Sequence, residues 1–391
     1  MPNWAAWAGV LFAVIVLGEL LRAGALLFRT LKGQPSLDDL RGAILRDPRH
    51  HVTVVIPCKD EEAYIEQSVR SILSSDCPFV DLVVVDDRST DRTREIVENL
   101  AREDSRITLT SIEELPTGWT GKTHALYEGT RRASGNILLF TDGDTVLAPH
   151  AISRSLAFFV ANDLDMLSLF PGFTRRGFSE NAIYPHLALG LVYLCPLVEV
   201  NDPSSPVALA SGPFIMVTRN AYEDVGTWKA LRTEITEDIA LAAAVKAHGR
   251  TLMAATGNDL VRTREFASVG EVCQFWRRTY YGAFGKKPRK LLRLTASFTS
   301  LTILFLLMSL SAILYVTGNG ALPSNILFIL SAAAMLAVIV PFGVFLHHQE
   351  GNVAYALTAP LGIAVSLWVA LSTFVAVLGD KGIQWRGSLY R

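Results

Sequence analysis

Four long apolar runs interrupt the otherwise mixed pattern of hydrophobic and polar residues along the 391-residue chain. Each run is long enough to cross a bilayer core of about 30 Å as a helix. The composition agrees, because half of the residues are hydrophobic, only 19% are charged and the mean hydropathy is +0.31, values too apolar for an ordinary soluble protein. We therefore expect membrane-crossing helices within residues 4–28, 294–316, 325–346 and 353–378.

Between residues 51 and 140 the pattern changes to short apolar runs that alternate with amphipathic stretches. The short runs predict strands, and apolar positions spaced three and four residues apart predict helices. Such a chain forms a mostly parallel sheet with helices on both faces, and it binds its ligand at the carboxyl ends of the strands. We predict strands at 51–57, 81–85, 107–109 and 137–140, with helices at 62–75, 91–101 and 122–132.

These patterns divide the chain into six parts. The first apolar run has no basic n-region and no small-residue cleavage site, so we interpret it as an anchor and not as a removed signal peptide. We expect an N-terminal transmembrane anchor at 1–30, a linker at 31–50, an α/β domain at 51–265, an interfacial amphipathic region at 266–293, about three transmembrane helices within 294–378 and a tail at 379–391.

Basic residues indicate which side of the membrane each part faces. They cluster after the first apolar run and before the second, so the positive-inside rule places the α/β domain in the cytoplasm. Three further spans would put the tail outside, whereas its basic residues Lys381, Arg386 and Arg391 favour the inside. One segment could therefore be re-entrant, with a break at Pro341 or Pro360.

Charge, cysteines and the missing nucleotide motifs narrow the class of protein. The net charge of −1 gives no argument for nucleic-acid binding, and the four cysteines form no CxxC pair. This cysteine pattern fits a reducing compartment and argues against a disulfide or zinc framework. The sequence has no GxGxxG or GxxxxGK[ST] segment after a predicted strand, which weighs against NAD, FAD and P-loop nucleotides.

Acidic residues follow the predicted strands at the edge where a ligand would bind. Asp142 and Asp144 come after the strand at 137–140, and Asp86 and Asp87 come after the strand at 81–85. Two carboxylates separated by one glycine offer oxygen ligands for Mg²⁺ or Mn²⁺ and leave positions for diphosphate oxygens. The same stretches are also good turn and helix-capping sequences, so the local sequence leaves both interpretations open.

Four acidic motifs, taken in order, carry a resemblance to a known family. They are VVIPCKDEE at 54–62, VDDRSTD at 85–91, DGD at 142–144 and TED at 236–238. Their order and spacing resemble the family 2 glycosyltransferases with a GT-A fold, and four ordered motifs are far more specific than any one of them. Further segments are similar to membrane-bound members that act on lipids, namely the hopanoid-associated, carotenoid-ester and ceramide types: GWTGK at 118–122, VNDP at 200–203, ASGPF at 210–214 and QWRG at 384–387.

The resemblance implies a role for each matching residue. The nucleoside of a nucleotide-sugar, typically uridine, would lie among Asp60, Glu61, Asp86 and Asp87. Asp142 and Asp144 would hold the divalent cation on the diphosphate, Lys122 would open a helix facing that anionic ligand, and Asp238 would be the catalytic base. For the TED motif, local sequence alone favours capping of the helix that follows, whereas the family match favours the base.

The match departs from the family in the predicted interfacial region. Family members commonly carry Gln-x-x-Arg-Trp there, and this chain has Gln274-Phe-Trp276-Arg277-Arg278. Gln274 and Arg277 match, but Arg278 replaces the tryptophan, so Trp276 either covers for it or anchors the helix at headgroup level. We assign Glu237, Gln274, Trp276, Arg277 and Arg278 to the diphosphate and acceptor region.

A further apolar stretch at 183–198 is too short, and too interrupted by prolines, to cross a membrane. We interpret it as a membrane-facing wall for a lipid acceptor, with a buried core helix as the alternative.

The sequence thus predicts a membrane-bound, inverting glycosyltransferase that uses Mg²⁺ or Mn²⁺. It would move a hexose from a nucleotide-sugar, a UDP-sugar, to a hydrophobic lipid or isoprenoid acceptor. We expect a bacterial-type inner membrane, with the catalytic domain in the cytoplasm. The alternatives are a polyprenyl-phosphate sugar transferase, a polysaccharide synthase and, outside enzymes, a catalytically idle membrane scaffold or a lipid-binding transporter subunit.

Overall fold

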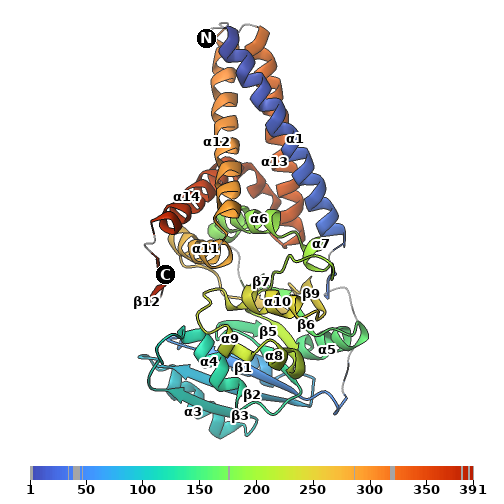
Figure 1. The fold of residues 1–391 in the computed structure, drawn as a ribbon, viewed down its shortest axis with the longest axis vertical. Helices are drawn as coiled ribbons and strands as arrows, with labels where there is room; N and C mark the ends of the chain where they lie inside the picture. Colours follow the sequence, from blue (N-terminus) through green and yellow to red (C-terminus); the bar gives the residue numbers. More distant parts are fainter. Residues whose placement is uncertain are drawn as a thin grey trace. The chain divides into compact units, whose positions relative to one another are not determined.

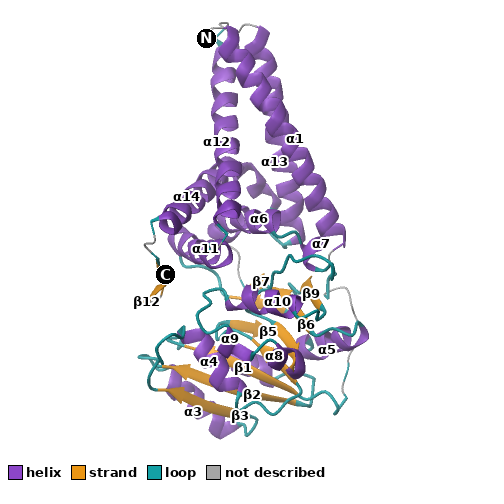
Figure 2. Cartoon of the chain, in the orientation of Figure 1, coloured by secondary structure: helices purple, strands orange, loops and turns teal. Residues whose placement is uncertain are grey.

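The computed structural model describes residues 3–33, 35–37, 45, 47–174, 177–285, 287–317, 322–379, 382–385 and 388–390. The chain divides into two compact units (Figures 1 and 2). The sheet unit comprises Gln34–Arg175 and Leu197–Glu265, and the helical unit comprises Met1–Gly33, Arg176–Pro196 and Phe266–Arg391. The tail residues Lys381, Arg386 and Arg391 lie outside the described residues.

Seven strands form the main sheet of the sheet unit: β1 (Val52–Cys58), β2 (Val80–Asp87), β3 (Ile107–Ile112), β4 (Ile137–Phe140), β6 (Met166–Phe170), β8 (Ile215–Thr218) and β9 (Leu252–Thr256). Their order is β3-β2-β1-β4-β8-β6-β9. β1 to β4 pair in parallel, and β8 runs antiparallel to both β4 and β6. β1 and β2 are rich in Val, Leu and Ile and buried along almost their whole length, as is typical of strands covered on both faces.

Helices cover both faces of this sheet (Figure 1). On one face, alternate residues of β1 pack in a core with α2 (Ile65–Leu73) and α3 (Thr93–Glu103). On the other face, Val83 and Val85 of β2 pack against Ala125 of α4 (Gly121–Thr130). The α/β class with a mostly parallel sheet and helices on both faces is therefore confirmed.

The sheet unit also holds shorter elements. A small second sheet has the order β5-β10-β7, and it consists of β5 (Thr145–Leu147), β10 (Val261–Thr263) and β7 (Gly172–Phe173). The other helices of the sheet unit are α5 (Ala151–Ala161), α7 (Leu197–Val200), α8 (Arg219–Asp224), α9 (Thr227–Ala230) and α10 (Glu237–Ala247).

Two predicted boundaries near the candidate ligand-binding edge of the sheet differ from the structure. β2 continues through Asp87, because Asp86 and Asp87 pair with Ser111 and Ile112 of β3. The acids expected in a loop after the strand are thus its last two residues. The helix predicted to begin at residue 62 is α2, which begins at Ile65, because the polar residues before it form hydrogen bonds with the segment after β2.

The helical unit contains α1 (Asn3–Gly33), the π-helix η1 (Ser179–Ile183), α6 (Tyr184–Leu194), α11 (Val269–Phe284), α12 (Pro288–Val316), α13 (Leu322–His348), the 3₁₀ helix η2 (Val353–Thr358), α14 (Ala359–Leu378) and the short strands β11 (Ile383–Trp385) and β12 (Ser388–Tyr390). Four helical segments among the described residues are long and apolar enough to cross a membrane: those ending at Gly33, Val316, His348 and Leu378. Pro341 lies inside α13, and α14 carries Pro360 in its first turn after η2. The apolar stretch predicted at 183–198 contributes α6, where His186 is buried and stacks on Phe342 with ring centroids 3.8 Å apart.

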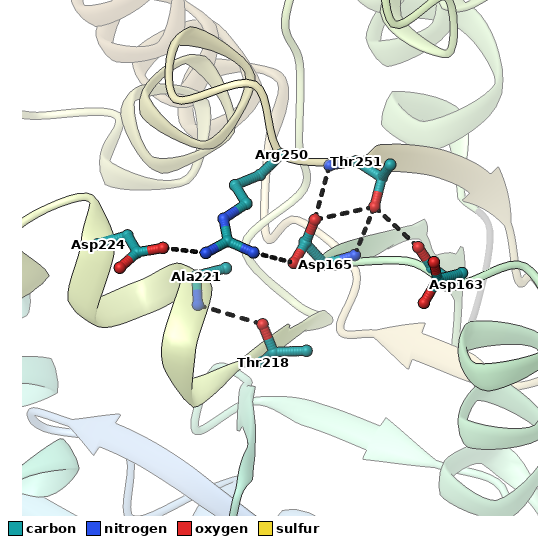
Figure 3. A network of polar contacts seen from close by, with 7 residues as sticks. All are labelled: Asp163, Asp165, Thr218, Ala221, Asp224, Arg250 and Thr251. Carbon is teal, nitrogen blue, oxygen red and sulfur yellow. Dashed lines mark hydrogen bonds and ion pairs between the residues drawn. The ribbon is translucent and has the colours of Figure 1, made fainter.

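A polar network joins the beginnings of β6 and β9 at one end of the main sheet (Figure 3). Asp165 Oδ2 accepts hydrogen bonds from the backbone N–H and the hydroxyl of Thr251, at 2.9 and 3.0 Å, and Asp165 Oδ1 accepts one from Arg250 at 3.2 Å. The same guanidinium also pairs with Asp224 of α8. Asp165 therefore holds the start of β9 in place and also forms an ion pair with Arg250.

We expect Asp165→Ala to lower the free energy of unfolding by about 1–3 kcal/mol, since it removes the hydrogen bonds that the ionised carboxylate accepts from Thr251. Asp224→Ala is the matched control, because it removes only an ion pair to Arg250 from a side chain that is 46% exposed; we expect a loss of at most about 1 kcal/mol. Denaturant unfolding of the detergent-solubilised protein measures both. Equal losses would contradict the role given to Thr251.

Candidate active site

The loops that follow β1 and β2 are joined by hydrogen bonds. Asp60 Oδ1 accepts from the backbone N–H of Thr90 at 2.7 Å, and the Asp60 N–H donates to Ser89 Oγ at 3.0 Å. The next N–H, of Glu61, donates to Thr93 Oγ1 at 2.8 Å. Asp60 has φ +53°, a left-handed conformation that only a few non-glycine residues adopt. The predicted nucleoside-binding acids Asp60 and Glu61 thus lie beside the end of β2, as the parallel pairing of β1 and β2 requires.

Asp86 and Asp87 are buried at this edge, with 3% and 5% of their surface exposed, and Glu61 is buried with them at 7%. Asp87 accepts two hydrogen bonds from the Arg88 guanidinium, at 2.8 and 3.1 Å. It also lies against the start of α4, where a Cβ on Gly121 would overlap Asp87 Oδ2. A carboxylate at a helix N-terminus is favoured by the unpaired N–H groups and the helix dipole. This contact holds the start of α4 next to the end of β2.

Lys122, in the first turn of α4, bridges two carboxylates. Its Nζ lies 2.6 Å from Asp142 Oδ1 and 2.7 Å from Glu237 Oε1. The helix starts there because Thr120 Oγ1 accepts a hydrogen bond from the Thr123 N–H, as expected of an N-cap. Burial lowers the pKa of Lys122, but the Asp142 and Glu237 carboxylates raise it by more, so the pKa lies above the usual value of lysine. The ammonium therefore stays charged at neutral pH.

Asp238 lies at the same place, at the start of α10. Its Oδ2 accepts a hydrogen bond from the Gly212 N–H at 3.1 Å, and its Oδ1 accepts one from the Ile239 N–H at 2.8 Å. A Cβ built on Gly212 would be 3.3 Å from Lys122 Nζ, 3.5 Å from Asp142 Oδ2 and 3.7 Å from Asp238 Oδ2. Three side chains from three separate motifs therefore converge on one glycine, where a larger residue would crowd them.

Capping explains only part of the TED motif. Thr236 occupies the N-cap position of α10, but its side chain makes no capping hydrogen bond. Glu237 contacts Lys122 across the site, and only 6% of its side chain is exposed. Asp238 contacts both the first turn of its own helix and Gly212.

Asp144, the second acid of the DGD motif, contacts Arg264. The Arg264 Nε donates to Asp144 Oδ2 at 3.2 Å, and the guanidinium lies over the ring of Tyr64, 5.5 Å from its centroid. Arg264 also donates to the carbonyl of Glu265 at 3.1 Å. A cation therefore sits on each acid of the motif, Lys122 on Asp142 and Arg264 on Asp144.

The sequence analysis missed Arg264, and the sheet register shows why. β5 and β10 pair antiparallel with Thr145 opposite Thr263, so the residue before Thr145 and the residue after Thr263 are neighbours. These two residues are Asp144 and Arg264. No motif marks residue 264, because the signal is a pairing between strands more than a hundred positions apart in the sequence.

The side chains around Asp142 and Asp144 fit a small divalent cation that arrives with a phosphate ligand. Within the described part of the chain, no group of three or more His, Cys, Asp or Glu is gathered as a metal site. Two carboxylates are nevertheless the donor set that Mg²⁺ typically takes when substrate phosphates and water complete its coordination. In the structure each of the two acids forms an ion pair with a basic side chain, Asp142 with Lys122 and Asp144 with Arg264.

The remaining predicted residues, Gln274, Trp276, Arg277 and Arg278, belong to α11 in the helical unit. Trp276 is 3% exposed and packs edge-on against Tyr184, with ring centroids 5.3 Å apart. It is thus a core residue of the helical unit. Gln274 is exposed, the guanidinium of Arg278 lies 5.6 Å from the Phe275 ring centroid, and that of Arg277 lies 5.9 Å from the ring centroid of Trp368 in α14.

Comparison with known proteins identifies the family. Residues 48–282 match the family described as glycosyltransferase like family 2. The match covers more than half of the chain, so the chain belongs to this family, and the resemblance noted in the sequence is confirmed.

Individual relatives agree with this assignment. The 4,4'-diaponeurosporenoate glycosyltransferase of Staphylococcus aureus (strain USA300) is 26% identical over 289 residues, which cover 72% of this chain and 73% of that protein. Among solved structures, the mannosyltransferase PcManGT from Pyrobaculum calidifontis, in complex with GDP-Man and Mn²⁺, has a TM-score of 0.56 at 21% identity. The likeness covers 95% of this chain and 99% of that one, and it shows that the chain has the GT-A fold.

We expect Lys122→Met to lower the free energy of unfolding by about 1–3 kcal/mol, because it leaves the buried Glu237 carboxylate without its partner. The double variant Lys122→Met/Glu237→Gln should recover at least half of the loss, since both members of the pair are then neutral. Lys229→Met, at an exposed lysine of the same unit, should have no effect. Thermal unfolding compares all three with the parent, and an unchanged Lys122→Met would contradict the bridge.

Proposed function

We propose that the protein is a membrane-bound inverting glycosyltransferase that transfers a hexose from a nucleotide-sugar, a UDP-sugar, to a hydrophobic lipid or isoprenoid acceptor. The observation that carries this proposal is the convergence of Lys122, Asp142 and Asp238 on Gly212. It brings a charged amine, an acid of the DGD motif and a candidate base to one end of a mostly parallel sheet, where such folds bind ligands.

The donor would occupy the edge formed by the ends of β1, β2 and β4. Asp60, Glu61, Asp86 and Asp87 surround the place proposed for the nucleoside, where carboxylates can accept hydrogen bonds from base and ribose. Lys122 and Arg264 are the cations next to the proposed diphosphate position. A bound Mg²⁺ or Mn²⁺, held by Asp142 and Asp144, would neutralise the charge that develops on the leaving diphosphate. The Mn²⁺ and GDP-Man named for PcManGT support a nucleotide-sugar donor with a divalent cation, and they leave the base of the nucleotide open.

Asp238 is the proposed general base. Its two backbone hydrogen bonds hold the carboxylate in one orientation, and a carboxylate within reach of an acceptor hydroxyl can remove the proton as the new bond forms. With a single base and the diphosphate leaving from the opposite side, the anomeric carbon inverts. An acceptor that is already a carboxylate needs no base, and the name of the S. aureus relative points to such an isoprenoid acid.

The four apolar helical segments support an integral membrane protein. Following the basic residues next to the first and second apolar runs, we place the sheet unit in the cytoplasm of a bacterial-type cell, at its inner membrane. The lipid or isoprenoid acceptor would then reach the site from the membrane, while the nucleotide-sugar is supplied from the cytoplasm.

We expect Asp144→Asn to abolish Mn²⁺-dependent UDP-sugar binding, because it removes one of two proposed metal ligands. Asp238→Asn should retain that binding and lose about 10²- to 10⁴-fold in transfer to a hydroxyl acceptor, but less than about tenfold with a carboxylate acceptor, which carries no proton to remove. Calorimetric binding of UDP-sugar with Mn²⁺, and release of UDP in the presence of acceptor lipids, separate the two roles.

Asp163→Asn is the control for both substitutions, because Asp163 lies in the sheet unit with a left-handed backbone that asparagine also tolerates. Equal loss of donor binding in Asp144→Asn and Asp238→Asn would make Asp238 structural. If the parent protein neither binds nor hydrolyses any UDP-sugar with either metal, the proposed function is wrong.

We expect Arg264→Gln to tighten the binding of Mn²⁺ alone by about two- to fivefold, because the guanidinium competes with the metal for Asp144 through an ion pair worth up to about 1 kcal/mol. Arg262→Gln is the matched control, since Arg262 lies on β10 and pairs with Asp259. The free Mn²⁺ signal in electron paramagnetic resonance measures the affinity without nucleotide. Equal affinities in the parent and in Arg264→Gln would show that Arg264 does not occupy the metal position.

A further inference from the structure

α14 has the length and hydropathy of a membrane-spanning helix, but it does not run with the other three. In Figure 1, α1, α12 and α13 extend in broadly one direction, and α14 crosses that direction. It packs against α12, α11 and α6 and makes few contacts with α13. Composition alone therefore does not decide whether α14 crosses the bilayer.

Both ends of α14 are held by elements that lie close in the chain to the sheet unit. Before it, the Asn352 N–H donates to Asn181 Oδ1 of η1 at 2.9 Å, and the ring of Tyr355 in η2 contacts that of Phe178. After it, β11 packs against α11. The start and the end of the α14 segment are thus anchored to η1 and α11.

The connections from the sheet unit to η1 and α11 are too short to cross a membrane. Residues 176–178 lead from the sheet unit to η1, and residues 266–268 lead from it to α11. Three residues span at most about 11 Å, whereas the hydrocarbon core is about 30 Å thick. η1 and α11 therefore lie on the sheet unit's side of the membrane, and both ends of α14 lie there with them.

The middle of α14 carries a pair of side chains suited to a membrane surface. Trp368 lies halfway along the helix, 55% exposed, and the guanidinium of Arg277 is 5.9 Å from its ring centroid. If α14 crossed the bilayer, this arginine would lie near the midplane, where charged side chains are rare and unfavourable. Tryptophan and arginine are both common at the membrane–water interface.

The two faces of α14 differ, and the outer one fits lipid chains. The inner face packs closely on α6, since a Cβ on Gly362 would overlap the imidazole of His186. The outer face is an uninterrupted apolar stripe at helical spacing, formed by Leu361, Trp368, Leu371, Val375 and Leu378, each 47–67% exposed.

We propose that α14 lies along the membrane surface on the side of the sheet unit, with this apolar stripe inserted among the acyl chains of that leaflet. The chain then crosses the membrane three times, through α1, α12 and α13, and its C-terminus returns to the side of the sheet unit. This arrangement agrees with the positive-inside preference of Lys381, Arg386 and Arg391. It goes beyond the proposed transfer reaction and does not depend on it.

Cysteine labelling determines the side on which α14 ends. The four native cysteines are buried, so the full-length parent serves as the blank. A membrane-impermeant maleimide should label Gly379→Cys, directly after α14, in inverted vesicles but not in right-side-out vesicles. Ala161→Cys, exposed in the sheet unit, should behave in the same way, and Leu322→Cys, at the start of α13, should show the opposite pattern. Labelling of Gly379→Cys together with Leu322→Cys would overturn the proposal.

Spin-label depth measurement tests the orientation independently. Nitroxides attached to single cysteines at the five stripe positions, in vesicle-reconstituted protein, should report nearly equal and shallow depths from oxygen and nickel-chelate accessibility. The control series at Ile329, Leu336 and Val340 of α13, all 60–65% exposed, should change steadily in depth along that helix. A stripe that is deepest near Trp368 and Leu371 and shallow at both ends would show that α14 spans the bilayer.

Discussion

The charge bridge from Lys122 to Asp142 and Glu237 is the interaction on which the candidate active site depends. It joins the loop after β4 and the starts of α4 and α10, which come from three distant parts of the chain. Lys122 Nζ lies within 2.7 Å of both Asp142 and Glu237, so its charge offsets the repulsion between these two acids. Asp238, next to Glu237 in the chain, is held by the backbone N–H groups of Gly212 and Ile239.

The parts of this site that the sequence predicted are those encoded locally. Apolar runs that end in acids place Asp142 and Asp144 at a strand end, and the periodicity before and after them predicts the sheet. Arg264 was missed, because its position next to Asp144 follows from the pairing of β5 with β10. Asp86 and Asp87 were placed one element too late, because their pairing with β3 extends β2. The register between strands that are distant in the sequence cannot be predicted from the local pattern of residues.

In the helical unit, too, the sequence predicted the elements but not how they pack against one another. Hydropathy gives the lengths of its apolar helices, but it contains no information about their direction, which depends on side-chain packing. Trp276 is an example, because the sequence left open whether it replaces the family's tryptophan or anchors the helix at headgroup level, and gave no sign that Tyr184, more than ninety residues earlier, packs against it. The direction of α14 likewise depends on the close approach of Gly362 to His186, two residues in separate apolar segments.

The hydrogen bonds between the loops after β1 and β2 have a consequence for how donor preference can change during evolution. Asp60, Ser89 and Thr90 depend on one another, and the left-handed backbone of Asp60 accepts few other residues. A substitution in one loop that alters the fit to a nucleoside base therefore disturbs the other loop as well. A change in the proposed nucleoside preference would therefore require coordinated replacements in both loops.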